Sequence, residues 1–127
     1  MGYSGLKSWQ SSDVAADMVY TIEEKIVKEL NKAVKVKENE WNTSGPVNVA
    51  FFLEAFVLPL GKEARQHLCA EIFDNTEVFS KAIEGLKKEI ALANAAALWE
   101  DEKNRKMHLK RYKELLSVVK KCEAFGN

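Results

Sequence analysis

Three side chains of metal-ligand type fall at four-residue steps in the middle of the chain: Glu63, His67 and Glu71. On a continuous helix this spacing places them on one face, where carboxylates and an imidazole can bind a metal ion. The pattern is neither the His-Glu-x-x-His of zinc proteases nor the Glu-x-x-His of di-iron bundles. Two glutamates beside a histidine are also typical of a solvated helix face. We therefore expect no metal or other cofactor here.

Groups for acid–base or nucleophilic catalysis are few. His67 and His108 are the only histidines, and the sequence has no Gly-x-Ser-x-Gly or phosphate-binding glycine pattern. Asp13 and Asp17 could pair at helical spacing for acid–base catalysis. Carboxylates at the start of a helix also cap it and complement its dipole, and we favour that role. The sequence therefore does not predict an enzyme.

The distribution of charge is more informative than its total. The chain has 19 basic and 19 acidic side chains, so it has no global attraction to nucleic acid or to an anionic membrane. Between positions 103 and 121, however, Glu114 is the single acidic residue among eight basic ones. The basic residues are Lys103, Arg105, Lys106, Lys110, Arg111, Lys113, Lys120 and Lys121.

This basic segment has two interpretations. It could bind phosphates or an acidic partner. Alternatively, it could pair with acidic helices of the same protein or complement a helix dipole. Taken together, the basic residues spread around the predicted helix, which favours the second interpretation. The residues from Lys103 to Lys113 remain candidates for partner binding.

Tyr3 and Trp9 lie in a glycine-containing lead-in to the first predicted helix. Aromatic side chains on such a segment could dock a partner. More often such a segment folds back and covers one end of its own bundle, and we favour this role. Tyr3 and Trp9 are nevertheless retained as candidate partner-binding residues.

The elements that position these residues begin with a long helix, predicted from Asp13 to Val36. Ser11, Ser12 and Asp13 offer side-chain oxygens for its first amides. Apolar residues recur at three- and four-residue steps, which predicts one apolar face, with glutamates and lysines elsewhere. That face comprises Ala15, Met18, Ile22, Ile26, Leu30 and Ala33, and the polar positions include Glu23, Glu24, Lys28 and Glu29.

A second helix is predicted after a polar loop at 37–45. Pro46 suits a first helical position, and residues 47–58 are apolar on nearly every side. A buried strand is the competing interpretation, but twelve residues is long for a strand. We therefore expect a central, buried helix that ends at Pro59 and Gly61.

Three more helices are predicted, over 62–73, from about 76 to 99, and from Asp101 to the end of the chain. Gly85 interrupts the second of them, which indicates close packing by a neighbour. The sequence thus predicts an all-α fold in which residues 1–127 form a single compact bundle of about five helices around a central apolar helix.

The sequence also bears on location. Residues 1–10 lack the apolar run of a secretory signal, and the longest apolar stretch is interrupted and too short to span a membrane. Cys69 and Cys122 form no Cys-x-x-Cys motif. We expect a soluble cytoplasmic protein with two free thiols that does not associate with membranes. The alternative is a disulfide between them, which would require the fold to bring the two cysteines together.

Two short motifs resemble an uncharacterised bacterial family of small helical proteins, the domain of unknown function 4259. The first is Gly2-Tyr3-Ser4-Gly5 followed by Trp9 and by Ser12 to Asp17, and the second is Leu98-Trp99-Glu100. Ser4 stands where that family has a tryptophan, and the spacing before Asp17 is one residue longer. The resemblance implies a small all-helical fold, and it carries no activity because the family has none established.

Two functions follow as hypotheses. The first is a small intracellular interaction protein, such as an adaptor, an inhibitor or an immunity or accessory factor, which binds another protein. The alternative is binding of nucleic acid or an acidic partner through residues 103–121. A homo-oligomer is compatible with both.

Overall fold

The structure is a computed structural model that describes residues 13–37, 43–95 and 101–126. Its elements are α1 (Asp13–Ala33), α2 (Gly45–Phe52), the π-helical segment η2 (Leu53–Val57), α3 (Lys62–Leu68), α4 (Ala70–Asp74), α5 (Thr76–Asn94) and α6 (Glu102–Phe125). Every regular element in the described ranges is helical, so the predicted all-α fold is confirmed. None of these helices combines the length and apolarity needed to cross a membrane.

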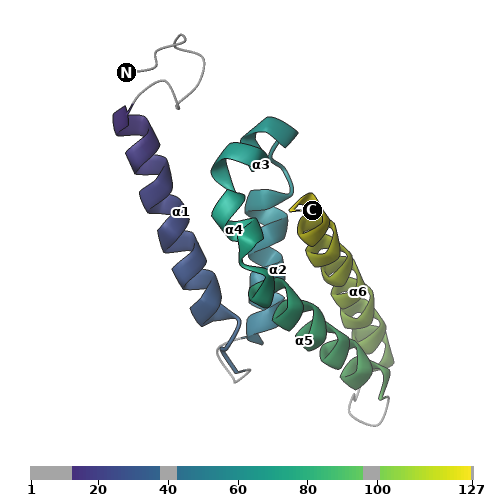
Figure 1. The fold of residues 1–127 in the computed structure, drawn as a ribbon. Helices are drawn as coiled ribbons and strands as arrows, with labels where there is room; N and C mark the ends of the chain where they lie inside the picture. The colour runs from purple at the N-terminus through teal and green to yellow at the C-terminus, as the bar shows by residue number, and fades with distance from the viewer. Residues whose placement is uncertain (1–12, 38–42, 96–100, 127) are drawn as a thin grey trace.

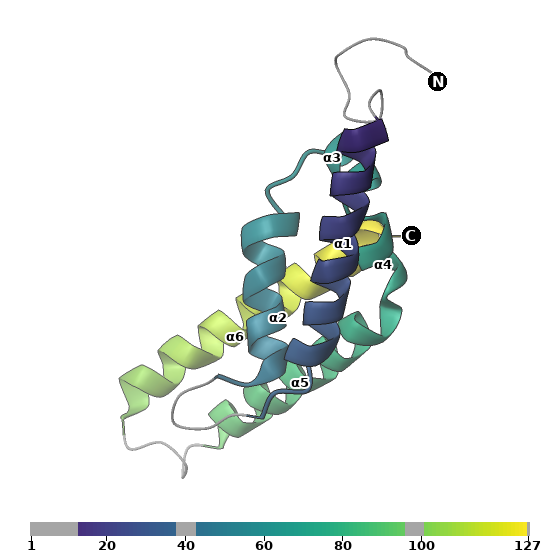
Figure 2. The ribbon, with the colours of Figure 1, turned by 90° about the vertical axis from the view of Figure 1, so that its left-hand side faces the viewer.

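The helices are arranged around α2 and its continuation η2. Helices α5 and α6 run antiparallel and pack along each other, and α2 lies against both (Figure 1). Helix α1 runs antiparallel to α2 on the side away from α6, and it also contacts α3 and α4 (Figures 1 and 2). Helix α1 is therefore attached through α2, α3 and α4, away from the α5–α6 pair.

One continuous core joins α1, α2, η2, α4, α5 and α6. Its buried side chains are apolar, and among the described residues α3 contributes none of them. The largest are Leu53, Ile72, Phe79, Leu86 and Leu115, with Cys69 and Cys122 among them. The burial of aliphatic and aromatic surface is the main source of stability in such a fold.

Two glycines allow close packing around the start of α2. A Cβ atom at Gly85 of α5 would lie 2.1 Å from Cγ of Pro46, so the predicted close neighbour of Gly85 is the proline ring. A Cβ atom at Gly45 would lie 2.2 Å from the backbone oxygen of Ala33 at the end of α1. Pro46 lies in the first turn of α2, as its fixed φ angle predicts.

Helix α2 continues into one turn of π-helix. The amide of Leu58 donates to the carbonyl of Leu53 at 2.9 Å, a step of five residues. The apolar run 47–58 predicted burial on every side, but Phe51 and Phe56 are exposed. These two side chains mark where the helix reaches the surface of the bundle.

Several predicted helix boundaries are wrong. Helix α1 ends at Ala33 and not at Val36. Beyond Ala33, the amides of Lys35 and Val36 bond to carbonyls three residues earlier in the chain, which is not the α-helical step of four. The predicted helix 62–73 is two helices, because Cys69 adopts φ −124° and ψ 10° and interrupts it. No glycine or proline stands at this break. Helix α5 ends at Asn94, before the predicted end near 99.

Candidate interaction surfaces

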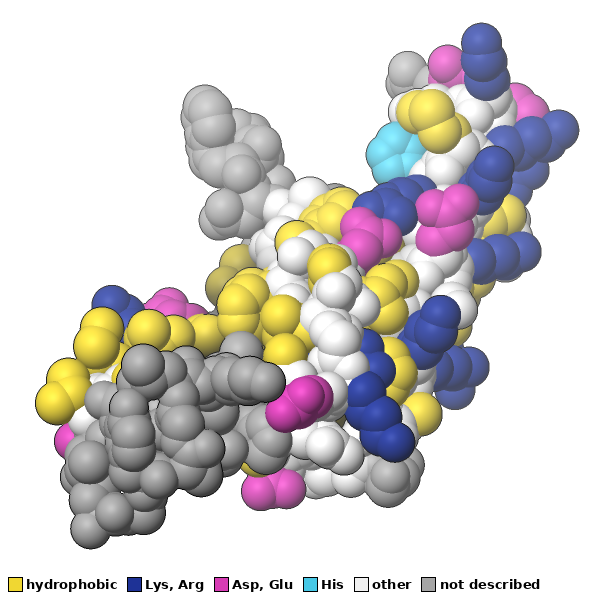
Figure 3. Space-filling view, turned by 90° about the horizontal axis from the view of Figure 1, so that it is seen from above, with side chains coloured by type: hydrophobic (Ala, Val, Ile, Leu, Met, Phe, Trp, Pro, Cys, Tyr) yellow, Lys and Arg dark blue, Asp and Glu magenta, His cyan; other side chains and the backbone are white. Residues whose placement is uncertain are grey.

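An apolar groove lies between α1 and α2, and we call it the α1–α2 groove. Its volume is about 380 Å³. The groove is lined by Ile22, Lys25, Ile26, Glu29, Leu30 and Ala33 of α1 and by Asn48, Val49 and Phe52 of α2. Figure 3 shows hydrophobic side chains gathered on the left-hand side of the view, where α1 lies. The groove is therefore an open, mostly apolar depression in the surface.

Ile22 is the residue that joins this groove to two neighbouring hollows. It also lines a smaller hollow beside Phe56 and a shallow one beside Val14 and Met18. Val14, Met18 and Ile22 are 70%, 61% and 55% exposed and follow one another at four-residue steps along α1. An apolar row thus leads from the first turn of α1 into the groove.

This arrangement corrects the predicted orientation of α1. Met18 and Ile22 belong to the predicted core-facing row but are exposed, whereas Glu23, predicted to lie on the polar side, is only 2% exposed. The carboxylate of Glu23 accepts a hydrogen bond from the backbone amide of Glu71, at 2.5 Å. That amide is in the first turn of α4, so Glu23 caps α4 from another helix. The break at Cys69 frees this amide.

The electrostatics of Glu23 follow from its burial. Removal from water raises the pKa of the Glu23 carboxyl, and the charges of Glu71 and Asp74 raise it further. The hydrogen bond from the Glu71 amide acts in the opposite direction on this pKa. Glu23 is thus a buried acid at the junction of α1 and α4, with one strong acceptor contact and two acidic neighbours.

The second surface is on α6, where four lysines face solvent and two arginines make contacts within the protein. Lys103, Lys106, Lys110 and Lys113 follow one another at steps of three, four and three residues and are all exposed. We call them the lysine row. Within the described ranges none of them forms an ion pair. Lys and Arg side chains line the edge of the molecule on which α6 lies (Figure 3).

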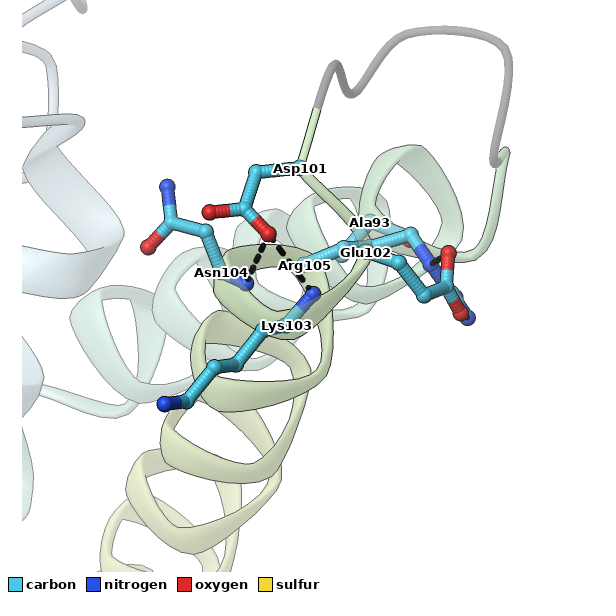
Figure 4. A network of polar contacts seen from close by, with 6 residues as sticks. All are labelled: Ala93, Asp101, Glu102, Lys103, Asn104 and Arg105. Atoms are coloured by element: carbon cyan, nitrogen blue, oxygen red, sulfur yellow. Dashed lines mark hydrogen bonds and ion pairs between the residues drawn. The ribbon is translucent and has the colours of Figure 1, made fainter.

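Arg105, by contrast, makes contacts inside the protein. Its guanidinium binds both carboxylate oxygens of Glu102 and donates to the carbonyl of Ala93, at 3.3 Å, in the last turn of α5. Asp101 caps α6 by accepting from the amides of Lys103 and Asn104 (Figure 4). The Lys103 side chain points away from the Glu102–Arg105 pair in this view. Arg105 therefore links the first turn of α6 to the last turn of α5.

Arg111 also makes contacts inside the protein. It binds Glu54 of η2 through two nitrogen–oxygen contacts, at 2.9 and 2.5 Å, and Glu114 at 3.2 Å. The hydrogen bonds from Arg111 lower the pKa of the Glu54 carboxyl. The eight basic residues do spread around α6, but the two arginines are used within the fold and the lysine row faces solvent.

The weak metal-ligand candidates Glu63, His67 and Glu71 do not lie on one continuous helix. The break at Cys69 places Glu63 in α3 and Glu71 in α4, so the assumed continuous helix does not exist. The side chain of His67 lies outside the described residues. Among the described residues no group of three or more histidine, cysteine or acidic side chains could hold a metal ion.

The other candidates for chemistry have structural contacts or lie outside the described residues. The ring of His108 lies 6.0 Å from that of Tyr112, and its Nδ1 is 2.9 Å from the carbonyl oxygen of Asn104. Asp17 is exposed, and the side chain of Asp13 lies outside the described residues, as do Tyr3 and Trp9. The described residues thus bring no candidate acid, base or nucleophile together in a polar pocket.

The two cysteines are free thiols in the core. Burial raises the pKa of the Cys69 thiol, and that of the Cys122 thiol, to about 11. At neutral pH both are therefore protonated and behave as small apolar side chains.

Comparison with known proteins adds no relative. The chain matches no protein-family model, and no curated protein or solved structure is significantly similar to it. The resemblance to the domain of unknown function 4259 therefore stays a prediction. Trp9 and Leu98-Trp99-Glu100, which carry much of that resemblance, lie outside the described residues.

Proposed function

We propose that this protein is a small helical interaction module that binds another protein through the α1–α2 groove. The observation that supports this most is the row of Val14, Met18 and Ile22, which leads along α1 into the groove. Scattered apolar side chains on a protein surface are ordinary, but a contiguous apolar surface with a hollow is typical of a binding site.

The shape of the groove favours an amphipathic helix as the bound element. Such helices insert apolar anchors at steps of three and four residues into grooves between helices. Ile22, Ile26 and Phe52 provide apolar walls, and Lys25 and Glu29 provide one charge of each sign. Affinity would come mainly from apolar burial, because the groove offers no excess of either charge.

The experiment is affinity purification of the tagged protein from its native cells, with and without nuclease. We expect one stoichiometric protein partner that survives nuclease and is lost from Met18→Glu/Ile22→Glu. The matched control is Lys110→Glu/Lys113→Glu, which should keep the partner. Circular dichroism checks folding of each variant. A partner that is retained by the first variant, or nucleic acid as the sole co-purifying species, would contradict the proposal.

The lysine row supports a second candidate function, the binding of a polyanion such as nucleic acid. Lysines on one face of a helix can follow phosphates, and four such contacts would give log Kd a slope of about 3.6 against log salt on duplex DNA. Lys106→Glu/Lys110→Glu/Lys113→Glu should abolish binding, whereas Lys87→Glu on α5 should change it little. Binding that is independent of salt would contradict this function.

A further inference from the structure

We infer that the smaller hollow beside Phe56 binds a small apolar amine, whose ammonium group pairs with the carboxylate of Glu23. We call this site the Glu23 hollow. It is lined by Val19, Ile22, Glu23 and Ile26 of α1 and by Phe56 of η2. The inference goes beyond the proposed function, because the ligand is a small molecule and its binding needs no partner protein.

The Glu23 hollow extends from the surface towards the buried acid. Its volume is about 220 Å³. Ile22 and Phe56 are 55% and 36% exposed, whereas Glu23 is only 2% exposed. The Phe56 ring stacks on that of Phe52, which lines the α1–α2 groove, with 5.2 Å between the ring centroids. The hollow and the groove are therefore neighbours that present different aromatic rings.

Glu23 is a buried acid that no basic side chain neutralises among the residues that the structure describes. Its carboxylate accepts from the Glu71 amide at 2.5 Å, and the charges of Glu71 and Asp74 act on it unfavourably. No described lysine, arginine or histidine forms an ion pair with it. Buried carboxylates are ordinarily paired with a cation. A carboxylate has about four acceptor positions, and the amide uses one of them. A ligand cation would therefore complement this acid.

The other lining side chains determine the body of the ligand. All four are apolar, and Phe56 adds an aromatic face that attracts both rings and ammonium groups. An apolar cavity of about 150 Å³ holds a benzene ring, so this hollow has room for a ring and a short chain. A metal ion is a poor fit, because it needs several oxygen ligands and Glu23 is the single acid among the described lining residues. An arylalkylamine fits both the volume and the charge.

Binding of such an amine should depend on pH through Glu23. Burial and the charges of Glu71 and Asp74 on α4 raise the pKa of its carboxyl. Cys69 beside it carries no charge at neutral pH, since burial raises its thiol pKa to about 11, and the Arg65 cation acts on that thiol. An ammonium group in the hollow would favour the ionised carboxylate. The amine itself stays protonated to about pH 10, so its affinity should rise with pH through the raised pKa of Glu23.

The test is an NMR titration of the full chain with phenethylamine, followed through the methyl signals of Val19, Ile22 and Ile26. Phenethyl alcohol is the matched neutral probe, because a hydroxyl replaces the ammonium at nearly the same volume. Butylamine has the ammonium of a lysine side chain and no ring. We expect saturable shifts with phenethylamine and affinity about tenfold lower for each of the other two probes.

Two pairs of variants locate the ligand. Glu23→Gln keeps an acceptor for the Glu71 amide, and it should reduce the affinity for the amine to that for the alcohol. Raising the pH from about 5 to about 8 should strengthen amine binding to the wild type but not to Glu23→Gln. Phe56→Ala should weaken binding of both the amine and the alcohol. Phe51→Ala is its control, because Phe51 is similarly exposed, at 39%, and does not line the hollow. Circular dichroism checks the folding of each variant.

Three outcomes would overturn the inference. The first is the lack of saturable phenethylamine binding. The second is a preference for the amine that is missing in the wild type or survives Glu23→Gln, which would place the cation on another acid. The third is butylamine that binds as tightly as phenethylamine, which would assign the hollow to a lysine side chain of a partner. Since no partner protein takes part, these failures are distinguishable from failure to capture a partner.

Discussion

Arg111 of α6 and Glu54 of the π-helical segment form a two-point ion pair between residues 57 positions apart in the chain. The pair joins η2 to the last helix on the surface of the core, where each side chain is about one-third exposed. Bidentate geometry makes such a pair more directional than a lysine contact. It also explains why Arg111 is not part of the surface that the lysine row presents.

Replacing Glu54 by glutamine should lower the free energy of unfolding at neutral pH but not at low pH. Because Arg111 lowers the folded pKa of Glu54, the ion pair stabilises the fold above the ordinary carboxyl pKa and is lost as pH falls through the lowered value. We expect Glu54→Gln to cost about 1 kcal/mol or less at pH 7, as for other partly exposed pairs, and nothing at low pH. Urea unfolding at both pH values measures this, with Glu63→Gln as the control. A cost that is the same at both pH values would contradict the assignment.

The contribution of Glu23 to stability should have the opposite pH dependence to that of Glu54. Its folded pKa is raised above the ordinary value of 4.5, so wild-type stability, relative to a neutral variant, falls as pH rises from about 4.5 through the raised folded pKa. Glu23→Gln keeps an oxygen acceptor for the Glu71 amide and removes the buried charge. We expect the variant to be the more stable protein at pH 7.5 and to lose this advantage near pH 4. Chemical denaturation at the two pH values decides, and a variant that is less stable only at high pH would refute the prediction.

The glycines around the start of α2 should be intolerant of a methyl group. Gly45→Ala meets backbone of α1 and Gly85→Ala meets the Pro46 ring, so each should cost about 1–3 kcal/mol or more, as overpacking does. Gly61→Ala is the control, since a Cβ atom there has no neighbour within 4 Å. Thermal unfolding compares the three variants. Equal thermal unfolding midpoints for Gly85→Ala and Gly61→Ala would contradict the prediction, because they would show that the Pro46 ring moves aside at little cost.

Both thiols should be unreactive in the folded protein. With pKa values of about 11 and no exposed surface, Cys69 and Cys122 present little thiolate at pH 8. We expect a thiol-specific disulfide reagent to react with them much more slowly than with the urea-unfolded chain. Cys69→Ser or Cys122→Ser leaves one thiol to be followed separately. Rapid reaction of either thiol without denaturant would place it outside the core.

The sequence predicted the helices well wherever local signals set them. Pro46 lies at the start of α2, and Gly85 lies against a close neighbour, because proline and glycine act through their own backbone geometry. The break at Cys69 has no such signal. It is accompanied by a hydrogen bond from the Glu71 amide to Glu23, a residue 48 positions earlier. A contact at that separation leaves no periodic pattern to detect.

The interaction surfaces were predicted only in part for the same reason. Apolar periodicity identified Met18 and Ile22 but did not show that they face outward, because the buried side of α1 includes Glu23, whose hydrogen-bond partner is 48 positions away in the chain. The basic residues of α6 were identified by composition. Their division into internal arginines and an exposed lysine row depends on Glu54, Glu102 and the Ala93 carbonyl, which only the folded structure brings close.

The contact between Glu23 and Glu71 also bears on the order in which the protein folds. Helices α5 and α6 are consecutive and joined by a short connection, so their pairing closes a small loop. The contact of Glu23 with the Glu71 amide, by contrast, closes a loop of 48 residues and needs α4 to be present. Because the entropy lost on loop closure grows with loop length, we expect the α5–α6 hairpin to form before α1 docks on α4. The same order, reversed, makes the α1–α4 junction open to hydrogen exchange before the α5–α6 hairpin does.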